Sequence, residues 1–96
     1  MKVATFVSGK VPSDKKAEFI AGYSSASSDS RPPGLERSFL MRGVDDPEAY
    51  TIETIWESRE ALEAMRSRGK PKAVELFERV GVSPHVWIHE IEATIS

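Results

Sequence analysis

Hydrophobic and polar residues alternate along four stretches of the chain, which is the pattern of β-strands with two unlike faces. These stretches cover residues 2–8, 35–42, 49–56 and 84–95. Turn-forming residues separate them, with a Pro-Gly pair before the second stretch and an Asp-Asp-Pro run between the second and the third. Because only a short loop joins the second and third stretches, we expect these two strands to pair antiparallel.

Between the first two strands, apolar residues recur at the spacing of a helix. Phe19, Ile20 and Tyr23 lie on one face of this helix, and Ser13 before it is the expected N-cap. The serine-rich run at residues 24–30 should end the helix, because serine side chains compete for backbone hydrogen bonds. We interpret the run as a fraying helix end and a solvated loop.

A second helical region follows the third strand and is expected in two pieces. Ser58 is a suitable N-cap for a helix over residues 59–66, and Gly69 interrupts the pattern. Pro71 suits a first-turn position and restarts the helix through Val80. The expected inner stripe of the second piece is Ala73, Val74, Phe77 and Val80.

The resulting element order is β-α-β-β-α-β, with the second helix broken. This order predicts an α+β, ferredoxin-like fold in which helices cover one face of a four-stranded antiparallel sheet. A length of 96 residues suits one domain, so residues 1–96 are expected to form a single domain.

The second face of this sheet is not predicted to be polar. In the last strand His85, Trp87, His89 and Ile91 oppose Val86 and Ile88, so large apolar groups point both ways. Such a face would expose more apolar surface than a monomer usually leaves in water. We therefore predict a homodimer in which two open sheet faces pack against each other.

Composition and charge exclude several classes of partner. Thirteen Lys and Arg against 15 Asp and Glu give a net charge of -2, so no general positive field attracts nucleic acid. The chain contains no Cys, which fits a reducing cytoplasm and excludes thiolate chemistry. No apolar run approaches the roughly 20 residues of a membrane span, so we expect a cytoplasmic protein without a membrane partner.

The segment "PPGLERSFLMRGVDDPEAYTIETIWESREALEAM" at residues 32–65 resembles the antibiotic biosynthesis monooxygenase (ABM) domain, a family of dimeric α+β barrel proteins. The shared features are a Pro-Gly-Leu that enters the second strand, an Asp-Pro hairpin loop, and a strand that ends in Trp-Glu before a helical Glu-Ala-Leu. The resemblance implies the α+β barrel dimer, and it implies that Trp56 faces a cavity between sheet and helices.

Members of this family include haem-degrading enzymes and cofactor-independent monooxygenases that oxidise phenolic or quinol-like polyketides with molecular oxygen. The resemblance implies that a haem-degrading member has a His on the helix after Glu-Ala-Leu and an Asn on the first strand. Here Met65 and Arg66 stand near the first position, and the first strand contains no Asn. An Arg side chain offers no lone pair to iron, so we expect no haem and no other cofactor.

Four residues are candidates for binding a small aromatic substrate: Trp56, Tyr50, Tyr23 and His89. Trp56 could be the wall of a pocket or core filling, and both roles could hold together. Tyr50 shares the face of Trp56, and either tyrosine could donate a hydrogen bond to a phenol or simply pack. His89 could act as a base, or it could be a hydrogen-bonded surface or interface residue.

No metal site is expected. His85 and His89 share a strand face but lie roughly 13 Å apart at about 3.3 Å per residue. The acidic residues fall on a strand and a helix with different periods, so their carboxylates should not converge; they are Glu53, Glu57, Glu60 and Glu63. The basic run "RSRGKPK" at residues 66–72 fits a solvated loop, or it could attract an anionic substrate.

The chain contains no phosphate-binding glycine loop, no dinucleotide fingerprint and no spacing that suggests a Ser-His-Asp triad. The sequence therefore favours an ABM-like, cofactor-independent monooxygenase acting on an aromatic molecule of the quinol or polyketide type. The alternative is a non-catalytic, dimeric domain of the same fold that binds small molecules or is associated with stress. The sequence leaves open whether the protein is an enzyme.

Overall fold

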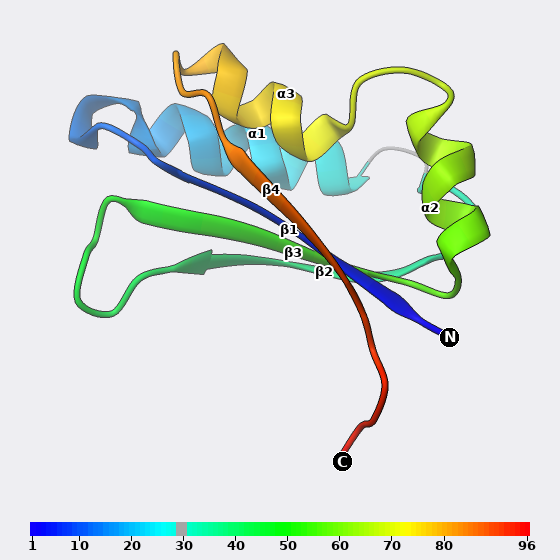
Figure 1. Ribbon diagram of the computed structural model, residues 1–96. Coiled ribbons are helices and arrows are strands. Elements are labelled where there is room, and N and C mark those ends of the chain that lie inside the picture. The colour runs from blue at the N-terminus through cyan, green and yellow to red at the C-terminus, as the bar shows by residue number, and fades with distance from the viewer. Residues whose placement is uncertain (29–30) are drawn as a thin grey trace.

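A computed structural model describes residues 1–28 and 31–96 (Figure 1). Four strands form one antiparallel sheet in the order β2-β3-β1-β4, and the predicted ferredoxin-like α+β fold is confirmed. The elements in chain order are β1 (Val3–Lys10), a 3-10 turn η1 (Ser13–Lys15), α1 (Lys16–Ser28), β2 (Leu35–Arg42), β3 (Ala49–Trp56), α2 (Arg59–Arg66), α3 (Lys72–Arg79) and β4 (His85–Glu90).

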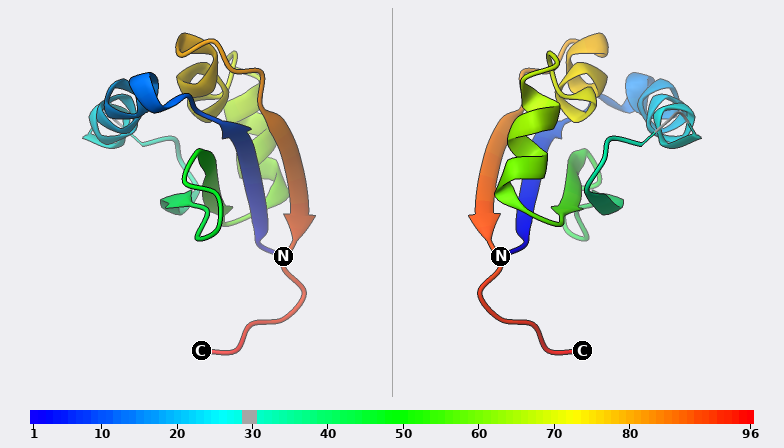
Figure 2. Two further views of the ribbon diagram at one scale, coloured as in Figure 1. Left: turned by 90° about the vertical axis from the view of Figure 1, so that its left-hand side faces the viewer. Right: turned by 90° about the vertical axis from the view of Figure 1, so that its right-hand side faces the viewer.

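The helices lie on one side of the sheet, and the other face is uncovered in the part of the chain that the structure describes (Figures 1 and 2). Burial alternates along β3 because successive side chains point to opposite faces. Its residues on the helix side are buried: Tyr50, Ile52, Thr54 and Trp56. We call the uncovered side the open face.

The larger part of the core joins α1 and α3 to the centre of the sheet. The ring centroid of Phe19 lies 4.7 Å from that of Phe77 and 5.4 Å from that of Tyr50. A β-carbon on Gly9 would lie 2.8 Å from a methyl group of Val82 and 3.1 Å from the ring of Phe77. The close packing of α3 on β1 therefore explains a glycine within this strand.

The first helix ends inside the serine-rich run, where the sequence predicts its end. α1 reaches Ser28, the fifth residue of that run. The hydroxyl of Ser28 donates to the carbonyl of Ser25 at 2.8 Å, and that of Ser27 donates to Ser24 in the same way. Such bonds let serine side chains compete for the backbone groups of the helix, which agrees with a helix end in this run. Positions 29–30 of the predicted run lie outside the described residues.

The predicted cap at Ser13 is wrong. Ser13 begins the 3-10 turn η1, and its hydroxyl donates to a carboxylate oxygen of Glu48 at 3.3 Å instead of accepting from the helix. Pro12 precedes the turn and fixes its own φ at -57°, which starts the turn without a side-chain cap. In contrast, Ser58 is the predicted cap of α2, because its hydroxyl accepts from the amide of Ala61 at 3.1 Å.

The last strand is shorter than predicted. The alternating pattern extends to Ile95, but β4 ends at Glu90. The amide of Ile91 makes the next hydrogen bond, to the carbonyl of Lys2 at 2.8 Å, and β1 provides no partner beyond that point. A strand needs a neighbour for its backbone groups, so the pattern alone does not set its length.

An ion pair ties the β2–β3 loop to the end of β1. The ammonium of Lys10 lies 3.0 Å from a carboxylate oxygen of Asp46. The hydrogen bond from Lys10 and a second one from the amide of Glu48 hold the pKa of Asp46 below its usual value. Both side chains are exposed, so this pair fixes the position of the loop more than it stabilises the fold.

None of the helices within residues 1–28 and 31–96 is long and apolar enough to cross a bilayer.

Candidate functional site

Trp56 ends β3 on the helix side and is only 3% exposed. It packs with Val3 and Leu62 in a small cluster of its own, and its indole nitrogen donates to the hydroxyl of Thr5 at 3.3 Å. It lines neither of the two surface hollows described below. Trp56 is therefore part of the core, and its role as the wall of a substrate site stays a prediction.

Tyr50, the second candidate, is 4% exposed and packs on the ring of Phe19 at the other end of β3. It belongs to the main core cluster, whereas Trp56 belongs to the separate cluster with Leu62. The two aromatic residues share a sheet face, as the alternation predicted, but they do not pack against each other.

The hydroxyl groups of Tyr23, Ser38 and Thr54 form a row between α1 and the sheet. The Tyr23 hydroxyl donates to Ser38 at 3.0 Å, and the Thr54 hydroxyl donates to the same oxygen at 3.4 Å. We call these three residues the hydroxyl row. The row brings polar groups from α1, β2 and β3 together within the layer between helices and sheet.

The sequence analysis found Tyr23 but missed the other two members of the hydroxyl row. Thr54 lies between Tyr50 and Trp56 on the same face of β3, so alternation already placed it on the buried side. Ser38 is a small polar residue within a strand, and nothing in the local pattern indicates its partner. Only the pairing of β2 with β3, which sets Ser38 opposite Thr54, makes the row visible.

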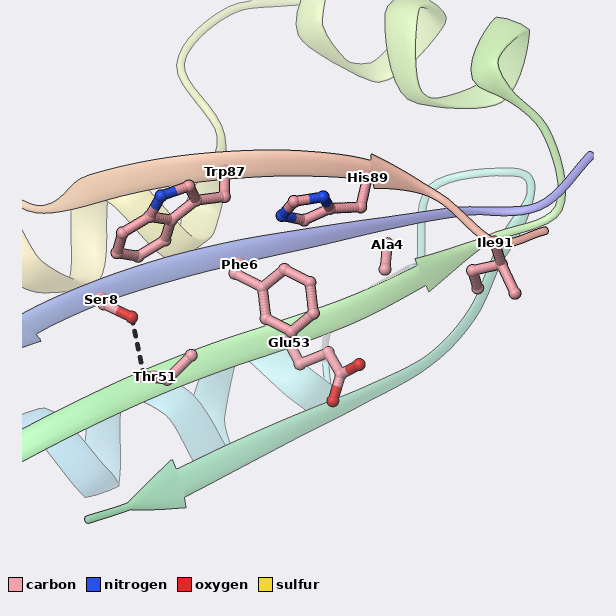
Figure 3. A pocket seen from close by; sticks show the side chains of 8 residues that line it. All are labelled: Ala4, Phe6, Ser8, Thr51, Glu53, Trp87, His89 and Ile91. Atoms are coloured by element: carbon pink, nitrogen blue, oxygen red, sulfur yellow. Dashed lines mark hydrogen bonds between the residues drawn. The ribbon is translucent and has the colours of Figure 1, made fainter. Parts of the chain in front are cut away.

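His89 lies on the open face, on the opposite side of the sheet from the other three candidates. Figure 3 shows it above the ring of Phe6, with the two ring centroids 5.8 Å apart in an edge-on arrangement. The structure therefore does not bring His89 together with Trp56, Tyr50 or Tyr23. A contribution of His89 to the same substrate site would need a contact that the single chain does not make.

The open face contains a shallow hollow of about 540 Å³ along β1, β3 and β4 (Figure 3). A hydrogen bond of 2.7 Å between Ser8 and Thr51 closes one end of it. Glu53 is the acidic residue among its lining side chains, and it lies opposite Phe6 in the register of β1 and β3. The lining residues are Ala4, Phe6, Ser8, Thr51, Glu53, Trp87, His89 and Ile91.

The open face exposes large apolar side chains around this hollow. Trp87 is 48% exposed, and Phe39 and Met41 on β2 are exposed to a similar degree. The register sets Phe39 opposite Glu53 and Phe6 opposite Trp87, which places these side chains on one continuous surface.

A smaller hollow of about 280 Å³ lies between the Pro32-Pro33 pair and α2. Ala61 and Met65 line it, and both also pack against the cluster that contains Trp56. Arg68 of the basic run is at its rim. The hollow therefore approaches the Trp56 cluster from outside, with the side chain of Met65 between them.

Two of the four basic residues of the run at residues 66–72 form ion pairs. Arg66 lies 3.5 Å from Glu63, and Lys70 lies 2.5 Å from Glu78, where hydrogen bonding to the carboxylate raises the pKa of Lys70. These contacts fit the interpretation of a solvated loop.

The side chains on the helix side do not fit a haem group. α2 contains Met65 and Arg66 but no His, α3 contains no His either, and β1 contains no Asn. Both histidines are on β4. Within residues 1–28 and 31–96, no three side chains of the His, Cys, Asp or Glu type gather in a way that could hold a metal ion.

Comparisons with known proteins identify the family. Residues 3–77 match the sequence model of the family described as antibiotic biosynthesis monooxygenase. The match covers most of the chain, so the protein belongs to the ABM family, as the resemblance predicted. A comparison with curated protein sequences returns no significant match.

Several solved structures have the same fold. SnoaB of Streptomyces nogalater, a cofactor-independent oxygenase, has a TM-score of 0.74 at 20% identity, covering 98% of this chain and 96% of SnoaB. MhuD of Mycobacterium tuberculosis, a heme-degrader, has a TM-score of 0.73 at 22% identity, covering 98% and 99%. A conserved protein of Methanosarcina mazei Go1 has a TM-score of 0.74 at 15% identity, covering 93% and 91%. At these identities the likeness concerns the fold.

Proposed function

We propose that the protein is a cofactor-independent monooxygenase that oxidises an aromatic molecule of the quinol or polyketide type with molecular oxygen. The observation that carries this proposal is membership of the ABM family over residues 3–77. The hydroxyl row offers hydrogen-bonding groups to a phenol, whereas α2 and α3 contain no His that could bind haem iron. SnoaB, of the same fold, is a cofactor-independent oxygenase. The cytoplasmic location predicted from the sequence belongs to the same proposal.

The chemistry relies on the reactivity of the substrate itself. A hydroquinone that has lost a proton is rich in electrons and can transfer an electron to oxygen. The protein then has to remove water from around the substrate, hold it in one orientation and assist the proton transfer.

The hydroxyl row provides suitable groups for these tasks. A phenolic oxygen could replace one of its internal hydrogen bonds, with Tyr23 as donor and Ser38 or Thr54 as the adjoining partner. Trp56 and Tyr50 then provide aromatic surface at either end of the row.

Neither of the two hollows described above extends to the hydroxyl row, so we expect side chains to move when a substrate enters from either of them. Met65 lies between the smaller hollow and the Trp56 cluster, and its unbranched thioether side chain can change rotamer at little cost. We expect Met65 to be the side chain that yields.

The first test is oxygen uptake with a panel of hydroquinones and anthrones. We expect Tyr23→Phe to lower kcat/KM by about 10- to 100-fold, because it removes the donor of the hydroxyl row and keeps the ring. Trp56→Phe and Tyr50→Phe should have smaller effects, since both keep an aromatic surface.

His89→Gln is the control for the opposite face of the sheet. A loss as large as that of Tyr23→Phe would move the substrate site to the open face. If no compound gives oxygen uptake above buffer with the wild-type protein, the alternative applies. In that case the protein is a non-catalytic, small-molecule-binding or stress-associated member of the same fold.

The proposal includes a homodimer that packs through the open face. The exposed apolar side chains of Phe39, Met41 and Trp87 support it, because a second copy would remove them from water. We expect Trp87→Glu to weaken dimerisation at least about tenfold in sedimentation equilibrium, since it would bury a charge. Val44→Glu, at an exposed position of the β2–β3 loop, should change nothing. A wild-type protein that sediments only as a 10.7 kDa species at micromolar concentration would disprove the dimer.

A further inference from the structure

One line of residues crosses the helix side of the sheet and includes two members of the hydroxyl row. Each of these residues lies opposite the next in the register of the strands. From β2 to β4 they are Ser38, Thr54, Thr5 and Ile88. We call these four residues the seam. Three of them carry a hydroxyl group, so the seam forms a polar band across this side of the sheet.

The seam separates the two core clusters of the protein. The cluster with Trp56 lies under α2, the main cluster with Phe77 lies under α1 and α3, and the two share no residue (Figure 1). On β1, Val3 belongs to the first cluster, Val7 belongs to the second, and Thr5 lies between them. Both valines are buried, whereas Thr5 is only half-buried. On this strand the helices therefore cover both neighbours of the seam more completely than the seam itself.

The two ends of the seam differ in exposure. At the β2 end, Tyr23 of α1 lies over Ser38 and donates a hydrogen bond to it at 3.0 Å. At the β4 end, Ile88 is 39% exposed although it lies on the side of the helices. Its neighbour on the same face of β4, Val86, is 51% exposed. The seam is thus covered by α1 at one end and open to solvent at the other.

Two hydroxyl groups of the seam have a hydrogen left to donate. The oxygen of Ser38 accepts from the hydroxyl groups of Tyr23 and Thr54. The oxygen of Thr5 accepts from the indole nitrogen of Trp56 at 3.3 Å. Within residues 1–28 and 31–96, neither Ser38 nor Thr5 donates its own hydrogen to another residue. Each of these two hydroxyl groups can therefore donate to a bound molecule.

We infer that the substrate lies along the seam over Thr54 and accepts hydrogen bonds from Ser38 on one side and Thr5 on the other. Ser38 and Thr5 are two strand spacings apart, about 10 Å, so one oxygen atom cannot bond to both. The two donors therefore fit an aromatic molecule with oxygen atoms on opposite sides of its ring system. The inference rests on the proposed function, whose quinol substrate has this property, and it adds Thr5 as a residue that binds the substrate.

The open end of the seam is then the entrance to the site. A molecule that arrives over β4 meets the exposed side chain of Ile88 first, and Thr5 is its neighbour on the next strand. The apolar surface of Ile88 suits an aromatic ring. Entry at this end does not require Met65 to move.

The first test measures the dissociation constants of anthraquinone and anthrone under nitrogen, because these two probes differ by one carbonyl oxygen. Thr5→Val keeps the shape of the side chain and should weaken binding of anthraquinone about 3- to 10-fold, since one hydrogen bond is lost. Binding of anthrone, whose single carbonyl pairs with Ser38, should change less than about twofold. Thr5→Ser restores the hydroxyl group and should bind both probes as wild type does.

The comparison of the two probes separates a contact with the substrate from a structural role. If Thr5 acted only by holding Trp56 in place, Thr5→Val would weaken the binding of both probes equally. Equal losses for the two probes, or no loss for either, would overturn the inference.

The second test measures the association rate constant of anthraquinone by stopped-flow tryptophan fluorescence. Ile88→Phe should lower this rate constant at least about threefold, because the larger side chain narrows the entrance. Ile20→Phe on α1 replaces an isoleucine that is 43% exposed, and as the matched control it should change nothing. Slower association with Met65→Phe and an unchanged rate constant with Ile88→Phe would overturn entry over β4.

The inference and the proposed function fail in different ways. Oxygen uptake by wild type, together with unchanged binding of anthraquinone in Thr5→Val, would overturn the role of Thr5 and leave the oxygenase intact. Binding that depends on Thr5, without oxygen uptake from any compound of the panel, would overturn the oxygenase and leave the seam as a binding site. A wild-type protein that neither binds a probe nor takes up oxygen would overturn both.

Discussion

Replacing Trp56 with alanine should lower the free energy of unfolding by about 3–5 kcal/mol. The indole is 3% exposed and fills the space between Val3 on β1 and Leu62 on α2, so its removal leaves a cavity. The hydrogen bond from the indole nitrogen to Thr5 is lost as well. Since small domains are stable by only about 5–15 kcal/mol, this variant should unfold at far lower urea concentration. Urea titration followed by circular dichroism measures the change.

Trp56→Phe is the matched control for this prediction. It keeps an aromatic ring in the cluster and loses only the hydrogen bond and part of the volume, so we expect a loss of about 1–2 kcal/mol. If Trp56→Ala lowers stability by less than about 1 kcal/mol, the indole is not packed as the structure shows. Space beside it would then strengthen its assignment as the wall of a substrate site.

Gly34→Ala should lower the free energy of unfolding by about 2–4 kcal/mol. Gly34 has a φ of +87°, and a β-carbon on it would lie 2.4 Å from the β-carbon of Ala61 on α2. Its carbonyl accepts the amide of Glu57 at 2.8 Å, so the backbone cannot move away without breaking that bond. Backbone strain and the clash with α2 therefore act together. Thermal and urea unfolding measure the sum.

Two further variants separate strain from clash. Gly81 has a φ of +80°, and a β-carbon on it would meet nothing within 4 Å, so Gly81→Ala measures backbone strain alone, at about 1–2 kcal/mol. Adding Ala61→Gly to Gly34→Ala removes the clash at the expense of about 1 kcal/mol of helix propensity. Equal losses for Gly34→Ala and Gly81→Ala would show that the contact with α2 is unimportant.

Some features of the fold follow from the local sequence alone. Alternation along residues 49–56 predicted which side chains share a face, because a strand turns by a fixed angle at every residue. The N-cap at Ser58 could be predicted for a similar reason, since a cap and the amide that it accepts lie three residues apart. The α+β fold follows from the order of such elements.

Other features depend on neighbours that are distant in the chain. β4 ends at Glu90 although the alternation continues, because β1 provides no further partner. Ser13 does not cap α1, since Pro12 starts a 3-10 turn before the helix and the Ser13 hydroxyl turns to Glu48. In both cases the local pattern is present, but a contact from another segment determines the outcome.

The sequence by itself determined the family, the order of strands and helices, and the residues that share a face with Trp56. Only the tertiary structure decided that Tyr23, Ser38 and Thr54 meet in one hydroxyl row and that His89 lies across the sheet from them. The physical reason is that periodicity fixes the direction of a side chain relative to its own element. Which face of that element is covered, and by which partner, depends on contacts between segments far apart in the chain.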